Sequence, residues 1–296
     1  MVPSGDENLQ TVRWVHSGKT CRGLIVQFHG NAANLTAHAP AVSWLAGEGY
    51  DVVAFDYRGY GLSSGTPTRE GLVQDGAAVL KYFVDHIPEC PRHIVIGQSL
   101  GGAVSGPSIV HSGVTVDALV LDSTFPSYRR IARQKLGSLW PTWLFQWPLS
   151  FLVSDSEALE DYFDRLTMPV VVLAGDRDKV VPKTWSEEIF EKLPAGRKQL
   201  WVQTGIGHTQ SLTVPSVRKR LLRFLDGDKF SKQGRIEKEP FLTAARPAGL
   251  RPPQSPSSTG LQARLRGLLC ASSPAGLSLV DNWLFLDASL FRLAFR

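Results

Sequence analysis

Hydrophobic residues in this chain gather in short runs that recur between residues 24 and 202. Each run has four or five nearly continuous apolar positions, which is typical of strands covered on both faces and therefore of a mostly parallel sheet. Residues 11–15 alternate better, with Val12 and Trp14 on one side and Arg13 on the other, and they predict an edge strand. The predicted inner strands lie at 24–28, 51–55, 93–96, 118–121, 170–173 and 199–202.

Helical patterns separate these runs, at 35–48, 68–85, 99–111, 184–193 and 214–225. Strand and helix therefore alternate, and this alternation predicts an α/β domain with a doubly wound, mostly parallel sheet. Ligands of such domains bind at the carboxyl ends of the strands. The residues that directly follow each strand are accordingly the ones to search for chemistry.

Two regions break the alternation. Residues 124–165 form a longer insertion, in which Pro141 and Pro148 prevent a single long helix. After residue 227 the composition changes to Pro, Ser, Arg, Ala and Leu, without the periodicity that a buried core requires. We therefore predict a domain over 1–227 with a short cap insertion at about 124–165, followed by a basic, linker-like or disordered tail over 228–296.

The formal net charge of +5 lies entirely in that tail. Residues 1–227 contain 22 basic and 22 acidic residues, whereas residues 228–296 contain 10 basic and 5 acidic residues. A neutral domain lacks the positive surface potential that attracts nucleic acids, so no nucleic-acid partner is expected.

The cysteines and the N-terminal residues of the chain indicate the cellular compartment. Cys21, Cys90 and Cys270 are too few and too scattered to predict a disulfide framework or a zinc site, and they are compatible with a reducing compartment. The start of the chain resembles no signal peptide, and no run of 18 apolar residues occurs. These features predict a cytoplasmic protein.

Glycines at positions 97 and 101 flank Ser99 in a G-x-S-x-G pattern. The pattern follows a predicted strand and precedes a predicted helix, which is the context of a strained elbow that exposes a nucleophilic serine above the sheet. Small neighbours are needed because the sharp turn brings the backbones of helix and strand together. The alternative is a serine that only caps the helix.

A serine nucleophile needs a general base, which in turn needs an orienting group. His208 follows the last predicted strand, at the edge of the sheet where a site is expected, whereas His86, His93 and His111 lie on helices or at a strand start. The loop after 170–173 offers two carboxylates, Asp176 and Asp178. Serine, acid and base in this chain order are typical of one large class of serine hydrolases.

With these residues in place, the chain resembles the α/β-hydrolase superfamily. The likeness covers about residues 11–226 and is closest to the branch that contains the bud-emergence (Bem) type proteins, the depalmitoylating α/β-hydrolase-domain enzymes and bacterial relatives. The matching segments are FHGNAAN at 28–34, FDYRGYGLSSGTPTREGLVQD at 55–75, GQSLGG at 97–102, GDRDKVVP at 175–182 and GIGHTQ at 205–210.

The resemblance implies a Ser99–His208–Asp178 triad and an oxyanion hole made by the backbone N–H groups of Asn31 and Leu100. It selects Asp178 over Asp176, which is expected to shape the loop. It also implies a structural role for His29, and we expect an internal salt bridge between Asp56 and Arg58. Neither a metal nor an organic cofactor is needed for this chemistry.

The activity implied is that of a serine esterase or thioesterase that cleaves esters or thioesters of hydrophobic acids through an acyl-enzyme. A serine peptidase, cleaving amides with the same triad, and a non-catalytic scaffold are the alternatives. Aromatic residues of the insertion are expected to line a channel for an acyl chain, or else to fill the core of the cap itself. The candidates for the channel are Trp140, Trp143, Phe145 and Trp147.

Relatives usually have another strand or two before the segment that begins at residue 11. Either the first edge strand of the fold is absent here, or translation starts upstream. The expected partner is a small-molecule or lipidated acyl substrate, and association with a membrane is expected only if an upstream N-terminal segment is missing from this sequence.

Overall fold

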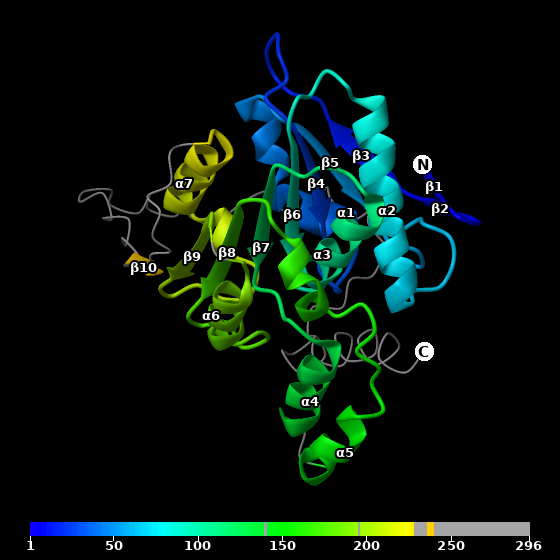
Figure 1. The fold of residues 1–296 in the computed structure, drawn as a ribbon, viewed down its shortest axis with the longest axis vertical. Helices are drawn as coiled ribbons and strands as arrows, with labels where there is room; N and C mark the ends of the chain where they lie inside the picture. Colours follow the sequence, from blue (N-terminus) through cyan, green and yellow to red (C-terminus); the bar gives the residue numbers. More distant parts are fainter. Residues whose placement is uncertain (139–140, 195, 228–235, 240–296) are drawn as a thin grey trace, which may run out of the picture.

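A computed structural model of the chain describes residues 1–138, 141–194, 196–227 and 236–239. Its main sheet has eight strands in the order β10-β9-β8-β7-β6-β4-β5-β3, all parallel except β3, which is antiparallel to β5 (Figure 1). A separate antiparallel pair is formed by β1 (Val2–Ser4) and β2 (Glu7–Leu9). The sheet strands are β3 (Thr11–Trp14), β4 (Leu24–Phe28), β5 (Asp51–Phe55), β6 (His93–Gln98), β7 (Ala118–Asp122), β8 (Val170–Gly175), β9 (Lys198–Gln203) and β10 (Ile236–Glu239).

The structure confirms the seven predicted strands and the mostly parallel, doubly wound α/β fold. Among the described strands β3 is the outermost at its end of the sheet, as the alternating pattern of residues 11–15 predicts. At the other end, β10 pairs with β9 and lies within the stretch that the sequence predicts as a tail. The remainder of 228–296 lies outside the described residues, so the domain boundary at 227 stays a prediction.

Four predicted helices appear nearly as expected, whereas the predicted helix over 35–48 is wrong as a single element. This stretch divides into α1 (Leu35–His38) and two short 3-10 turns, Ala39–Ala41 and Ser43–Glu48. Pro40 has no N–H to donate and its ring clashes with an α-helical carbonyl one turn earlier, so the α-helix ends before it. The confirmed helices are α2 (Arg69–His86), α3 (Leu100–Ser112), α6 (Lys183–Lys192) and α7 (Pro215–Leu225).

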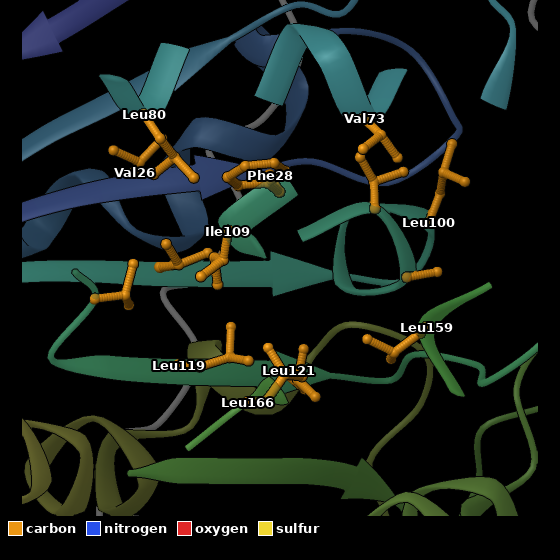
Figure 2. Close-up of a cluster of buried hydrophobic side chains, with 14 of the residues drawn as sticks. Val26, Phe28, Val73, Leu80, Leu100, Ile109, Leu119, Leu121, Leu159 and Leu166 are labelled. Atoms are coloured by element: carbon orange, nitrogen blue, oxygen red, sulfur yellow. The ribbon is translucent and has the colours of Figure 1, made fainter. Parts of the chain in front are cut away.

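Side chains that alternate along the strands build the two larger hydrophobic clusters of the described residues, one on each face of the sheet. Leu24, Val26 and Phe28 of β4 face the layer formed by α2 and α3, and Ile25 packs in the other cluster with residues of α7. Figure 2 shows the first cluster, where Val26 and Phe28 lie between Leu80 and Val73 of α2 and Ile109 of α3. Burial on both faces explains why the strands read as continuous apolar runs.

Cys21 and Cys90 form a disulfide, a single pairing that the number and spacing of the cysteines did not predict. The register of the sheet is the reason, because β4 and β6 are adjacent parallel strands in which Leu24 lies opposite His93. Each cysteine is three residues before one of these partners. Both therefore lie just before the amino ends of adjacent strands, close enough to pair. Since disulfides are rare in reducing compartments, the pairing lends no support to the cytoplasmic prediction. Within the described residues, no helix is both long and apolar enough to cross a bilayer.

The insertion between β7 and β8 contains α4 (Tyr128–Ser138), α5 (Gln146–Ser150) and two 3-10 turns, Trp143–Phe145 and Leu159–Arg165. In Figure 1, α4 and α5 project from the rest of the domain at the bottom of the view. An ion pair ties the insertion to α6: Arg130 of α4 binds both carboxylate oxygens of Glu188, at 2.7 and 2.5 Å. Within the insertion, the Ser127 hydroxyl donates to Asp155 at 2.7 Å.

Candidate active site

Ser99 occupies a sharp turn between β6 and α3. Its backbone has a positive φ, with φ 53° and ψ −117°, which costs a non-glycine residue of the order of 1–3 kcal/mol and is typical of functional sites. Its N–H donates to the carbonyl of Asp122 on the neighbouring strand at 2.9 Å. A Cβ built on Gly101 would lie 2.1 Å from the carbonyl oxygen of Phe28, so only glycine allows α3 to approach β4 this closely. The elbow expected from the sequence is therefore present.

Folding brings His208 and Asp178 to this serine. His208 Nε2 lies 2.9 Å from Ser99 Oγ, and His208 Nδ1 lies 2.8 Å from Asp178 Oδ2. Ser99 lies 109 residues from His208 in sequence, and each of the three follows a different parallel strand at the same edge of the sheet. The Asp178 side chain is 2% exposed, whereas the His208 side chain is 23% exposed and accessible to a ligand.

The surroundings of Asp178 fix the tautomer of His208. Burial by itself raises the pKa of Asp178, but the hydrogen bond and charge of His208 together with the N–H groups of Val181 and Val180 outweigh burial and hold that pKa below its usual value. An ionised carboxylate only accepts hydrogen bonds, so the proton of the neutral imidazole lies on Nδ1. Nε2 is then free to accept the Ser99 hydroxyl proton.

The predicted oxyanion donors lie beside the elbow. A Cβ on Gly30 would lie 3.5 Å from Ser99 Cβ, which places the turn containing Asn31 next to the nucleophile. Leu100 is the first residue of α3, and first-turn N–H groups of a helix have no partner within the helix. The Asn31 side chain is buried and accepts a 2.7 Å hydrogen bond from the Tyr60 hydroxyl, which holds the turn in place. Their role as oxyanion donors stays a prediction.

Comparison with known proteins finds similar sequences and similar folds. Residues 19–164 match the family model described as "Serine aminopeptidase, S33". Relatives include the uncharacterized protein YfhR of Escherichia coli K12, 33% identical over 186 residues, and protein bem46 of Schizosaccharomyces pombe, 30% identical over 185 residues. The matches cover 61% of this chain and 61% of YfhR, and 60% of this chain and 58% of bem46. Lysophosphatidylserine lipase ABHD12 of Danio rerio is 28% identical over 213 residues, 67% of this chain and 55% of that protein.

Solved structures of similar fold include esterase Est1E of Butyrivibrio proteoclasticus, with a TM-score of 0.59 and 18% identity, covering 75% of this chain and 97% of that one. Esterase Pf2001 of Pyrococcus furiosus has a TM-score of 0.56 and 25% identity, covering 74% of this chain and 91% of that one. The chain belongs to the α/β-hydrolase superfamily. Within the superfamily it is a relative of the Bem46 and ABHD proteins, and it spans about three fifths of the length of the curated relatives it first matches.

Three residues of this α/β-hydrolase that support the site were missed by the sequence analysis. Asp122 is the last residue of β7, and Ser123 and Thr124 directly follow it. Ser123 Oγ accepts the N–H of Thr209 at 3.1 Å, and Thr124 Oγ1 donates to the carbonyl of Ser99 at 2.8 Å. The segment thus connects the nucleophile elbow to the His208 loop. A polar group directly after a buried strand is the signal that would have revealed it.

Backbone strain marks the same junction. Ser123 and Thr209 both have a φ of 54°, and Ser99 has a φ of 53°. Asp122 is fully buried; burial raises its pKa, and the hydrogen bond from Gln98 partly offsets this effect. Of these three residues Ser123 and Thr209 are directly hydrogen-bonded, and strained residues of this kind cluster at functional sites.

The loop around the acid of this α/β-hydrolase is organised by Asp176. Its carboxylate accepts the N–H of Gly205 at 2.6 Å. This hydrogen bond joins the acid loop to the loop that contains His208, as expected for a loop-shaping residue. Asp178 Oδ1 accepts the N–H groups of Val180 and Val181 at 2.8 and 2.9 Å. Because the second oxygen holds His208, the Asp178 carboxylate is fully oriented.

The expected salt bridge between Asp56 and Arg58 is wrong. Arg58 instead donates to Asp75 on α2, with its closest contact at 2.7 Å. Asp56 accepts the N–H of Leu35 at 2.6 Å, and its carboxylate lies 3.3 Å from Nε2 of the buried His29. The His29 Nδ1 lies 2.7 Å from the carbonyl oxygen of Gly30, so His29 is part of the packed turn before Asn31.

The aromatic residues proposed for substrate binding lie on the cap. Trp143, Phe145 and Trp147 are 52, 57 and 59% exposed, so they do not fill a core of the cap. Trp140 lies outside the described residues. Their contact with substrate stays a prediction.

One group of described residues has the chemistry of a metal site. His16, Cys21, Asp51 and Cys90 have ligand atoms within 4.8 Å of one another, at the amino ends of the strands. The two sulfurs are joined in the disulfide, and a disulfide does not offer the thiolates that bind metals. His16 Nδ1 and Arg13 both bind the Asp51 carboxylate, at 2.6 Å each, so these atoms form an ion-pair cluster beside the disulfide.

Proposed function

We propose that this α/β-hydrolase is a serine hydrolase that cleaves carboxylic esters or thioesters of hydrophobic acids, with Ser99 as nucleophile, His208 as base and Asp178 as orienting acid. The observation that carries the proposal is the chain of two hydrogen bonds, of 2.9 and 2.8 Å, from Ser99 through His208 to Asp178. Esterases and a lipase among the similar proteins support an ester as the substrate.

The geometry suits an acyl-enzyme mechanism. As Ser99 Oγ attacks the acyl carbonyl carbon, His208 Nε2 accepts the hydroxyl proton and Asp178 stabilises the resulting imidazolium. The N–H groups of Asn31 and Leu100 stabilise the oxyanion, and loss of one such donor lowers turnover by about 10²–10³-fold. His208 then gives its proton to the leaving alcohol or thiol. Water, deprotonated by the same imidazole, hydrolyses the acyl-enzyme.

A peptidase is the second candidate, because the matching family model is described as a serine aminopeptidase. The match ends at residue 164, before the acid and the base, so it bears on the fold and the nucleophile more than on the leaving group. Amide cleavage would use the same three residues. The substrate panel below distinguishes the two candidates.

The test measures hydrolysis of p-nitrophenyl acetate, p-nitrophenyl octanoate, an octanoyl thioester and an aminoacyl p-nitroanilide by the wild type, Ser99→Ala and Ser105→Ala. Ser105 is a matched control, since it lies in the same helix, is fully buried and donates only to the Gly102 carbonyl at 2.9 Å. We expect Ser99→Ala to lose activity by on the order of 10⁴-fold or more, and Ser105→Ala to retain it.

We also expect a higher kcat/KM for the octanoyl esters than for the acetate, in line with a hydrophobic acyl group. Equal activity of the two serine variants would refute the proposal. Faster cleavage of the anilide than of every ester would favour the peptidase, and equal rates for acetate and octanoate would remove the preference for hydrophobic acids.

A further inference from the structure

The cap exposes an unusual number of large apolar side chains. Nine large hydrophobic side chains of the described residues are exposed, and six of them lie within residues 143–152. Monomeric soluble proteins rarely expose apolar groups gathered in this way unless they bind something there. We define the cap patch by its six members: Trp143, Leu144, Phe145, Trp147, Phe151 and Leu152.

Basic side chains are held directly against this patch. The guanidinium of Arg133 lies 3.8 Å from the ring centre of Trp147 and 5.7 Å from that of Phe151, and Arg129 lies 5.5 Å from the ring centre of Phe151. No carboxylate of the described residues pairs with Arg129 or Arg133, in contrast to Arg130, which binds Glu188. Both arginines are half-buried and, among the described residues, their side chains donate only to neutral acceptors of the cap, Arg129 to the Val153 carbonyl and Arg133 to the Ser150 hydroxyl, so their positive charges lie beside the apolar surface without a neutralising carboxylate.

The charge of the cap is opposite to that of the rest of the domain. Residues 128–152 contain four basic and no acidic residues, whereas the remainder of 1–227 contains 18 basic and 22 acidic residues. This asymmetry gives the domain a positive end at the cap and orients that end toward an anionic surface. It also disfavours a second copy of the chain as the occupant of the patch, because two such caps would repel each other.

We propose that the cap patch docks onto an anionic lipid bilayer. Trp and Phe side chains favour the level of the lipid headgroups, leucines extend into the acyl region, and arginines bind phosphates of the headgroups. Each Arg near an anionic membrane contributes about fivefold to binding. The inference does not rest on the proposed hydrolase activity, but a docked cap would hold the domain at the surface where acyl lipids are found.

The experiment measures co-sedimentation of the full chain with vesicles of phosphatidylcholine alone and of equal parts phosphatidylcholine and phosphatidylglycerol, at low and high salt. The test variant is Leu144→Ser with Leu152→Ser, at two positions that are 73 and 64% exposed. The matched control is Leu62→Ser, which is 77% exposed and far from the cap in sequence. A charge variant, Arg129→Gln with Arg133→Gln, is compared with Lys81→Gln on exposed α2 surface.

We expect binding to the anionic vesicles that weakens with salt, with a blue shift of tryptophan fluorescence. Removing the two leucines should weaken binding by about tenfold or more and removing the two arginines by about 25-fold, while the two controls bind as the wild type. Hydrolysis of a soluble ester should be the same in the leucine variant and its control, which separates docking from catalysis.

The proposal is overturned if the wild type does not bind anionic vesicles, or if the leucine variant binds them as well as Leu62→Ser does. It is also overturned if the patch mediates self-association instead, which would appear as a dimer in analytical ultracentrifugation that the leucine variant abolishes without any vesicle binding by the wild type.

Discussion

Replacing Gly101 by alanine tests how closely the nucleophile elbow depends on backbone contact. A Cβ at this position would lie 2.1 Å from the Phe28 carbonyl oxygen and 2.6 Å from the His29 carbonyl oxygen. Neither backbone atom can rotate away, and real Cβ atoms essentially never come within 3.0 Å of such neighbours, so the start of α3 must move away from β4 by roughly 1 Å.

The displaced residues include Ser99 and Leu100. A shift of this size changes the 2.9 Å contact between Ser99 Oγ and His208 Nε2 and the position of the expected oxyanion donors. A misplacement of about 1 Å costs on the order of 10²-fold in rate, and forced overpacking costs about 1–3 kcal/mol of stability. We therefore expect Gly101→Ala to fold with reduced stability and to lose about 10²-fold in kcat/KM.

The matched control is Gly106→Ala in the same helix. Its Cβ would meet Leu159 Cδ1 at 2.4 Å, but that atom is the end of a flexible side chain that can turn aside. Urea unfolding and kcat/KM for a p-nitrophenyl ester are measured for both variants. If Gly101→Ala retains the kcat/KM of Gly106→Ala, the elbow does not depend on the close approach and the reasoning is refuted.

Three further outcomes follow from other contacts. Replacing Cys21 and Cys90 by serine should lower the free energy of unfolding by about 2–4 kcal/mol, because the disulfide closes a loop with a sequence separation of 69; an unchanged urea midpoint would contradict this. Ser123→Ala removes the acceptor that holds the histidine loop, so kcat should fall severalfold and stability by about 1 kcal/mol, and an unaltered kcat would argue against a positioning role. Arg130 lowers the pKa of Glu188 to about 2. Because this folded-state pKa lies below the unfolded value, the pair stabilises the fold above about pH 4.5 and that stabilisation is lost as the pH falls toward 2. Glu188→Gln should therefore be less stable than wild type at pH 7, by under about 1 kcal/mol for so exposed a pair, and equal to it near pH 2; equal urea midpoints at both pH values would count against the pair.

Strands could be predicted well from the sequence because burial on both faces leaves continuous apolar runs such as that of β4. The candidate site followed from the same information. Parallel strands end at one edge, so Ser99, Asp178 and His208, each directly after a strand, were expected to meet, and the hydrogen bonds now found join them. Their catalytic roles are predictions, which the Ser99→Ala kinetics and the covalent labelling proposed below would test.

Pairings that depend on strand order could not be read from the sequence. Cys21 and Cys90 meet because β4 lies beside β6, which no local pattern reveals. The salt bridge expected between Asp56 and Arg58 failed for the same reason, because Arg58 binds Asp75 on α2, which is distant in sequence. The exposure of the cap aromatics could not be predicted for a different reason, because hydrophobic residues that face solvent and those that fill a core look alike in sequence.

The most direct test of the central claim is covalent labelling by a fluorophosphonate, followed by mass spectrometry of the labelled peptide. The account predicts a single adduct on Ser99 in the wild type, formed roughly 10²-fold or more slowly in His208→Ala, which lacks the general base. An adduct on another residue, or the same rate of labelling in His208→Ala, would contradict it.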